Sequence, residues 1–336
     1  MTHASRPSTG ALSRVVKGVV LTVCGLALLG VSPAGTSKSS ELKLAPSLPR
    51  SAHHAYGYTL ALEAFRRPGA RAWVEAAGRV TAEPERVELP VEVTGIFDAR
   101  RTALGIAFAV RAGRRIYVDV ETEPSDVPAD AESRSPFVDL FVAGDRGLEP
   151  VASPLPVRGR GADPLVQRVE AAALDAGEYV LRVQPEIGYA GGYRVSVRTA
   201  PLLMFPVEGM TTRAILSGFG AERDGGARSH RGVDIFAPRG TPALAAMDAF
   251  VSRVETTARG GNVVWLQPLF GDMRLYYAHL DTQLVRPGDL VLAGEIIGTV
   301  GNTGNAITTP PHLHFGVYVR RRGVRGGARD PYPFLD

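Results

Sequence analysis

Five residues in the last third of the chain are of the types that bind metals and transfer protons. Four of the seven histidines lie there, namely His230, His279, His312 and His314, and Asp234 stands four residues after the first of them. Imidazole is the commonest metal ligand in proteins and the usual acid–base group near neutral pH. Core packing does not need such a concentration, so the set indicates a metal-dependent active site.

The segment His312-Leu313-His314, followed by the apolar Phe315, reads as part of a strand. Residues two apart on a strand point to the same face. We therefore expect His312 and His314 to project together while Leu313 and Phe315 enter the core. One member of the pair can bind a metal while the other stands over the open coordination position.

His230 and Asp234 offer one nitrogen and one oxygen ligand from a single segment, and Gly232 between them allows a tight backbone path. With a third ligand from the histidine pair, the set is two histidines, one aspartate and a water, which suits a catalytic zinc site. Two neutral imidazoles and one carboxylate leave Zn²⁺ with net positive charge, enough to lower the pKa of its water to about 7.

The acid–base groups must also be histidines. The chain has no His-Glu-x-x-His helix and no Gly-x-Ser-x-Gly turn, so neither usual arrangement supplies the base. This work falls to His279 and to the unligated member of the pair. Each histidine alone would be an ordinary strand residue, but their joint occurrence at three separated places argues against that interpretation.

Three motifs in this order resemble the lysostaphin-type (LytM-like) zinc metallopeptidases: His230-x-x-x-Asp234, Tyr277-Ala278-His279-Leu280 and Pro311-His312-Leu313-His314-Phe315. Supporting matches follow Asp234 in Ile235-Phe236-Ala237-Pro238-Arg239-Gly240-Thr241-Pro242, and occur again in Arg286-Pro287-Gly288-Asp289 and Gly301-Asn302-Thr303-Gly304. The likeness spans about residues 210–335.

This resemblance implies an antiparallel β-fold with zinc on the floor of a groove. It implies that His230, Asp234 and His314 bind the zinc, and that His279 and His312 polarise the attacking water and stabilise the oxyanion. It further implies that the substrate and partner is bacterial peptidoglycan, cut at a peptide bond of its cross-links or stems.

Two other function classes fit the sequence less well. A peptidoglycan-binding regulator of another cell-wall hydrolase predicts broken metal ligands, and none is broken. The segment from Arg286 to Glu295 also resembles biotin and lipoyl carrier domains, but these need a modifiable lysine, and residues 201–336 contain none.

We expect a mainly β protein. Residues 41–80 form a linker and a short helical segment, with His53 and His54 at surface or capping positions. Period-two alternation in residues 81–200 indicates an antiparallel β-sandwich, which weakly resembles pre-peptidase C-terminal domains. We expect this accessory domain either to bind glycan or to regulate the groove. Residues 201–336 form the metallopeptidase domain.

Within that last domain, we expect Tyr318 to border the groove, because it shares the strand face of the histidine pair. We expect Tyr276 and Tyr277 to serve packing. Asp248 and Asp289 are expected at turns.

Residues 1–40 have the form of an export signal, with basic residues before a short apolar run at 19–31. We expect an exported protein of the periplasm or cell envelope; the alternative is a retained membrane anchor. The one cysteine, Cys24, lies inside the run and is interpreted as filler rather than as a lipidation site.

The net charge of +4 is mild. Arg320-Arg321-Arg322 is the basic run, and the glycines that interrupt it favour a solvated hairpin tip over a nucleic-acid contact. We therefore expect no nucleic-acid partner.

Overall fold

The computed structural model describes residues 51–335, except 63–68, 126–130, 162, 224, 270–271 and 322–323. The expected export signal, including Cys24, lies outside the described residues, as does the tip of the arginine-rich hairpin. The described elements all fall within the unit Pro49–Asp336. In the described part of the chain, no helix combines the length and apolar character that a membrane-spanning helix requires.

Two helices form the first described segment, α1 (Ala52–Leu62) and α2 (Ala70–Ala82). Gly69, just before α2, has a φ of 88°, a left-handed conformation that glycine adopts at little cost. The helices bury Leu60, Ala70 and Trp73 against Phe137 of the following sheet. The predicted helical segment is thus confirmed.

His53 does not lie at the surface, contrary to expectation. It is 7% exposed, stacks on Trp73 with ring centroids 4.5 Å apart, and its Nε2 lies 2.6 Å from Gln184 Oε1. His54 is exposed, as expected. The prediction was wrong for His53 because α1 packs against a sheet, a tertiary contact that the local sequence does not show.

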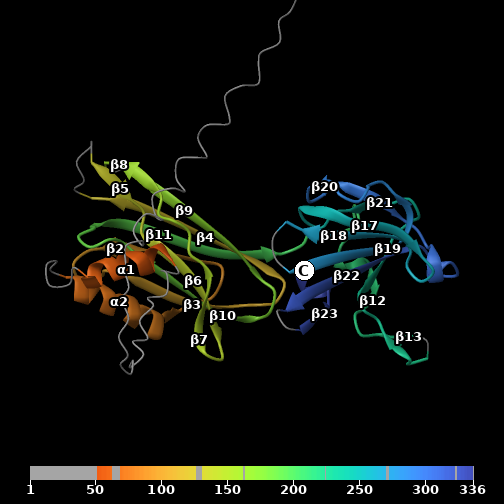
Figure 1. Ribbon diagram of the computed structural model, residues 1–336, viewed down its shortest axis with the longest axis horizontal. Helices are drawn as coiled ribbons and strands as arrows, with labels where there is room; N and C mark the ends of the chain where they lie inside the picture. Colours follow the sequence, from red (N-terminus) through yellow and green to blue (C-terminus); the bar gives the residue numbers. More distant parts are fainter. Residues whose placement is uncertain are drawn as a thin grey trace, which may run out of the picture. The chain divides into compact units, whose positions relative to one another are not determined.

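Residues 85–201 form two facing sheets and a separate pair of short strands (Figure 1). The first sheet has the order β1 (Glu85–Arg86), β3 (Leu104–Val110), β10 (Gly177–Gln184), β6 (Phe137–Gly144) and β7 (Gly147–Ala152). The second has the order β2 (Val91–Phe97), β11 (Gly191–Pro201), β4 (Arg114–Pro124) and β9 (Leu165–Ala173). The pair is β5 (Glu132–Arg134) with β8 (Arg158–Arg160). All pairings except β1–β3 are antiparallel.

In the sandwich strands, burial alternates with the period of two expected from the sequence. Tyr193, Val195 and Val197 of β11 all enter one core. In β10 the opposite face is buried too, because α2 covers it. Trp73 Nε1 donates to the Pro185 carbonyl at 2.7 Å, and Gln184 donates to the Trp73 carbonyl.

A ten-stranded sheet forms most of the remaining chain (Figure 1). Its main path is β12 (Ile215–Ser217), β15 (Val233–Phe236), β22 (His312–Arg321), β19 (Met273–Gln283), β18 (Gly261–Pro268), β17 (Ala249–Thr257) and β20 (Leu290–Val291). Off this path, β16 (Pro242–Leu244) pairs β21 (Ile296–Val300), β21 also pairs β19, and β23 (Val324–Arg329) pairs β22. Shorter elements are η1 (Thr212–Ala214), the hairpin β13 (Glu222–Arg223) and β14 (Arg228–Ser229), η2 (Gly304–Ala306) and α3 (Tyr332–Leu335).

This second sheet has a core of its own, formed by side chains such as Ile235, Leu275 and Leu313. At its centre, β22 lies between β15 and β19, and all three are antiparallel to their neighbours. The register sets Asp234 of β15 opposite His314 of β22. The pairing of these strands is therefore what brings residues 80 positions apart into one site.

Candidate active site

The alternation expected for β22 is confirmed. Leu313 and Phe315 are fully buried in the core. His312 and His314 take the other face, where both line a cleft of about 910 Å³. The two imidazoles thus come from one strand and point into one space.

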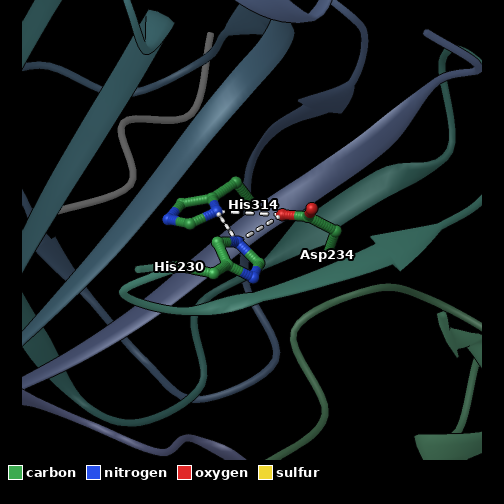
Figure 2. Close-up of side chains that lie close together, drawn as sticks. All are labelled: His230, Asp234 and His314. Atoms are coloured by element: carbon green, nitrogen blue, oxygen red, sulfur yellow. Dashed lines mark hydrogen bonds and ion pairs between the residues drawn. The ribbon is translucent and has the colours of Figure 1, made fainter. Parts of the chain in front are cut away.

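His230, Asp234 and His314 converge on a single point (Figure 2). Asp234 Oδ1 lies 3.0 Å from His230 Nε2 and 2.9 Å from His314 Nδ1. The two nitrogens are 2.9 Å apart. These three contacts form a nearly equilateral triangle of ligand-type atoms.

Gly232 makes this approach possible. A Cβ at this position would lie 2.4 Å from the Phe315 carbonyl oxygen and 2.9 Å from His314 Nε2. Both distances are far below van der Waals contact, so a larger residue would push the His230 segment away from β22. As expected, Gly232 allows a tight backbone path, because without a Cβ it can lie directly against β22.

The tautomer of His230 follows from its other nitrogen. His230 Nδ1 lies 2.8 Å from the Gly218 carbonyl oxygen, which can only accept a hydrogen bond. We therefore assign the proton of the neutral ring to Nδ1 and a lone pair to Nε2. His314 Nδ1 is then the one atom of the triangle that can carry a proton, and one proton cannot satisfy three contacts.

A cation fits this triangle. Zinc binds histidine nitrogen and carboxylate oxygen at about 2.0–2.2 Å, which for tetrahedral geometry separates the ligand atoms by roughly 3.3 Å. The observed separations of 2.9–3.0 Å are close to that value. The donor set and its spacing thus suit a tetrahedral metal with a free fourth position.

Asp234 is held in its ionised form. Burial alone would raise its pKa, but the interactions with the His230 and His314 rings outweigh burial and lower the pKa below its usual range. On the far side, Arg223 Nη2 donates to Asp234 Oδ2 at 2.7 Å and to Ser217 Oγ at 2.6 Å. Arg223 was missed from the sequence, where it sits in a hairpin with no recognisable spacing to the ligands.

His279 is fixed by the backbone around it. Its φ of 62° makes it the one described non-glycine residue in the left-handed region. Its Nδ1 lies 2.9 Å from the Thr303 carbonyl oxygen and its amide donates to the Gly260 carbonyl at 2.7 Å. Burial lowers the pKa of His279 to about 4. The ring is therefore neutral, with its proton on Nδ1 and a lone pair on Nε2.

The ring of His312 is also oriented by a backbone carbonyl. Its Nδ1 lies 2.9 Å from the Pro310 carbonyl oxygen, and its ring stacks on Phe236. Its Nε2 lies 4.0 Å from Asp234 Oδ1, and its ring centroid is 5.0 Å from that of His279. All five predicted site residues are thus brought together, three in the triangle and two, His279 and His312, beside it.

The other sequence predictions for this region have mixed outcomes. Tyr318 lines the cleft, as expected, and Tyr277 is fully buried. Tyr276 packs against Trp265, as expected, but it also lines the cleft, which was not expected. Asp248 and Asp289 each accept a hydrogen bond from a backbone amide, as expected of turn residues.

Comparison with known proteins agrees with this site. Residues 228–328 match peptidase family M23. The glycyl-glycine endopeptidase ALE-1 of Staphylococcus capitis is 42% identical over 108 residues, which is 32% of this chain and 29% of that protein. The peptidoglycan DD-endopeptidase ShyC of Vibrio cholerae is 37% identical over 107 residues, 31% of this chain and 24% of that protein.

The L-Ala–D-Glu endopeptidase of Bacillus subtilis is 33% identical over 139 residues, 39% of this chain and 42% of that protein. Among solved structures, the catalytic domain of lysostaphin from Staphylococcus simulans is 38% identical with a TM-score of 0.31, covering 35% of this chain and 88% of that one. Residues 228–328 of this chain therefore form a peptidase family M23 domain. It spans less than half the length of each of the three curated relatives.

Proposed function

We propose that this protein is an exported zinc metalloendopeptidase of the periplasm or cell envelope that hydrolyses peptide bonds in bacterial peptidoglycan. The observation that carries the proposal is the triangle of His230 Nε2, Asp234 Oδ1 and His314 Nδ1, with two further imidazoles facing the same cleft. Residues 201–336 would form the peptidase domain and residues 81–200 an accessory domain that binds glycan or regulates the groove.

In this proposal His230, Asp234 and His314 hold the zinc. When bound, zinc acts as a Lewis acid on the substrate carbonyl and lowers the pKa of its water to about 7. The Arg223 guanidinium keeps Asp234 Oδ2 occupied, so Asp234 offers one oxygen to the metal. Gly218 orients the ring of His230, which leaves Nε2 as the ligand atom.

His279 and His312 carry the proton transfers. Each has its Nδ1 proton bound to a backbone carbonyl, so each presents an Nε2 lone pair that can take a proton from the attacking water. A ring that has taken this proton becomes a cationic donor. It can then stabilise the oxyanion or protonate the departing amine.

The substrate class is supported by the relatives. Their names describe cleavage of glycyl-glycine bonds, of L-Ala–D-Glu bonds and of DD-linked peptidoglycan bonds. All three are peptide bonds, and the name of ShyC gives peptidoglycan as its substrate. We therefore propose peptidoglycan as the substrate without choosing among these bonds.

The test is a mass-spectrometric profile of peptidoglycan digested by the full-length protein. We expect cross-linked or stem peptides to be cut, the cutting to stop with a zinc chelator, and zinc to restore it. The His314→Ala variant is the matched control and is expected to be inactive with or without added zinc. Zinc-loaded wild-type protein that leaves the profile unchanged would disprove the proposal and favour a regulator of another hydrolase.

A further inference from the structure

Three aromatic side chains form one wall of the cleft beside the triangle. Trp265 of β18, Tyr276 of β19 and Tyr318 of β22 come together from three adjacent strands, with ring centroids 4.4–6.5 Å apart. Tyr276 also meets the His314 ring edge-on at 5.8 Å. We call Trp265, Tyr276 and Tyr318 the aromatic wall.

The aromatic wall is uncharged and closely packed. Burial raises the pKa of Tyr276 to about 12 and also raises the pKa of Tyr318, so both phenols stay protonated. Gly316 fits between them, because a Cβ there would lie 3.0 Å from Tyr318 Cε2 and 3.5 Å from Tyr276 Cβ. A substrate chain lying on this wall meets flat rings and no anion.

Two arginines flank the aromatic wall. Arg259 precedes Gly260, and the Tyr276 hydroxyl rests against Gly260, because a Cβ there would lie 2.3 Å from Tyr276 Oη. The charge of Arg259 acts on Tyr276. Arg231 lies near the other tyrosine: its carbonyl oxygen is 3.4 Å from the Cβ position of Gly316, and its charge acts on Tyr318. Both arginines line the cleft and both are exposed.

The charge of this cleft is unbalanced. Among the described residues that line it, the cations are Arg223, Arg228, Arg231 and Arg259, while the one acid is Asp234. Asp234 is already paired with Arg223. Arg231 and Arg259 form no ion pair with any described carboxylate, and Glu255, which is near Tyr276, does not line the cleft.

We propose that Arg231 and Arg259 form a subsite for a substrate carboxylate, so that this peptidase prefers acidic wall peptides over neutral ones such as oligoglycine. The inference rests on the proposed function. Arginine presents a planar fork of N–H donors that matches a carboxylate. Aromatic rings beside the subsite exclude water from one side and strengthen the attraction.

The expected size of the substrate preference follows from the exposure of the two arginines to solvent. Ion pairs at exposed arginines change binding equilibria modestly, here roughly two- to five-fold for each arginine. The two together should give about a tenfold preference, and the preference should weaken as salt is added, because the charges are accessible to solvent.

The experiment compares one peptidoglycan preparation before and after its carboxylates are converted to amides with carbodiimide and ammonium. This pair of substrates serves equally well whichever peptide bond of the wall is cut. The initial rate of soluble fragment release is measured for the full-length wild type, for Arg231→Gln with Arg259→Gln, and for Arg253→Gln. Arg253 is an exposed arginine of β17 that does not line the cleft, so it is the matched control.

We expect the wild type and the Arg253→Gln variant to cut the native wall about ten times faster than the amidated wall. The double variant should cut both walls at similar rates, with unchanged zinc content and melting temperature. Equal rates of the wild type on both walls would overturn the subsite while leaving the proposed peptidase in place. Failure of the zinc-loaded wild type on both walls would overturn the proposed function and this inference with it.

Discussion

The guanidinium of Arg223 lies 2.7 Å from Asp234 Oδ2, the oxygen that the histidines leave free. The other oxygen, Oδ1, faces His230 and His314. The carboxylate is therefore divided, with one oxygen held by a cation of the protein and the other directed into the triangle. Such outer contacts orient a ligand and commonly change metal affinity about 10- to 100-fold.

Arg223→Gln should accordingly weaken zinc binding by about 10- to 100-fold. The measurement is a competition titration against a chelator of known affinity, with Arg253→Gln as the charge-matched control. Arg223→Lys should restore part of the affinity, because it returns a cation without the fork of donors. Wild-type zinc affinity in Arg223→Gln would show that the contact is only structural.

His314→Ala should abolish zinc retention and activity together. The substitution removes one corner of the triangle, and two protein ligands do not make the three that a catalytic zinc site uses. Zinc content after gel filtration and fragment release from peptidoglycan measure the two effects. A variant that keeps stoichiometric zinc would contradict the assignment of His314 as a ligand.

His279→Ala and His312→Ala should keep zinc but lose turnover. Neither ring is a corner of the triangle, so metal content should match the wild type. Loss of a general acid–base group typically lowers the rate by about 10²–10⁴-fold. Full activity in His279→Ala would refute the proton-transfer role proposed for that ring.

The buried His53 should make stability depend on pH. Burial is the main cause that lowers its pKa from 6.5 to about 4, with Arg182 acting in the same direction. Below pH 6.5 the unfolded chain takes up a proton that the folded chain refuses until about pH 4. The free energy of unfolding therefore decreases as the pH is lowered through this window, by roughly 2 kcal/mol between pH 7 and pH 5.

Urea unfolding of the wild type and of His53→Phe at both pH values tests this. Phenylalanine keeps a flat ring against Trp73 but cannot titrate. Between pH 7 and pH 5 the free energy of unfolding of the variant should therefore fall by about 2 kcal/mol less than that of the wild type. Identical falls for the two proteins would mean that His53 is not the group responsible.

Much of the site was predictable from local sequence because strand alternation is a local property. It correctly placed His312 and His314 on one face, and Leu313 in the core. What it could not supply was strand register, and register sets Asp234 opposite His314. The resemblance to a known family implied that Asp234 and His314 belong to one metal site, and the structure places the two side chains in contact.

The errors and omissions share one cause. His53 is buried by a sheet from another part of the chain, Tyr276 reaches the cleft because its strand lies beside β22, and Arg223 meets Asp234 from a separate hairpin. Each depends on contacts between distant segments. Neither hydrophobic period nor residue type reports such contacts, so local reasoning assigned these residues wrongly or overlooked them.

Three of the four site imidazoles are oriented by main-chain carbonyls, those of Gly218, Thr303 and Pro310. Every amino acid supplies the same carbonyl, so the hydrogen bonds that fix the tautomers of these rings do not depend on the side chains of the three residues. An alanine substitution at any of the three positions would leave its carbonyl in place. Their contribution would emerge only from replacing the backbone amide itself, for example with an ester one residue further along, which weakens the carbonyl as an acceptor.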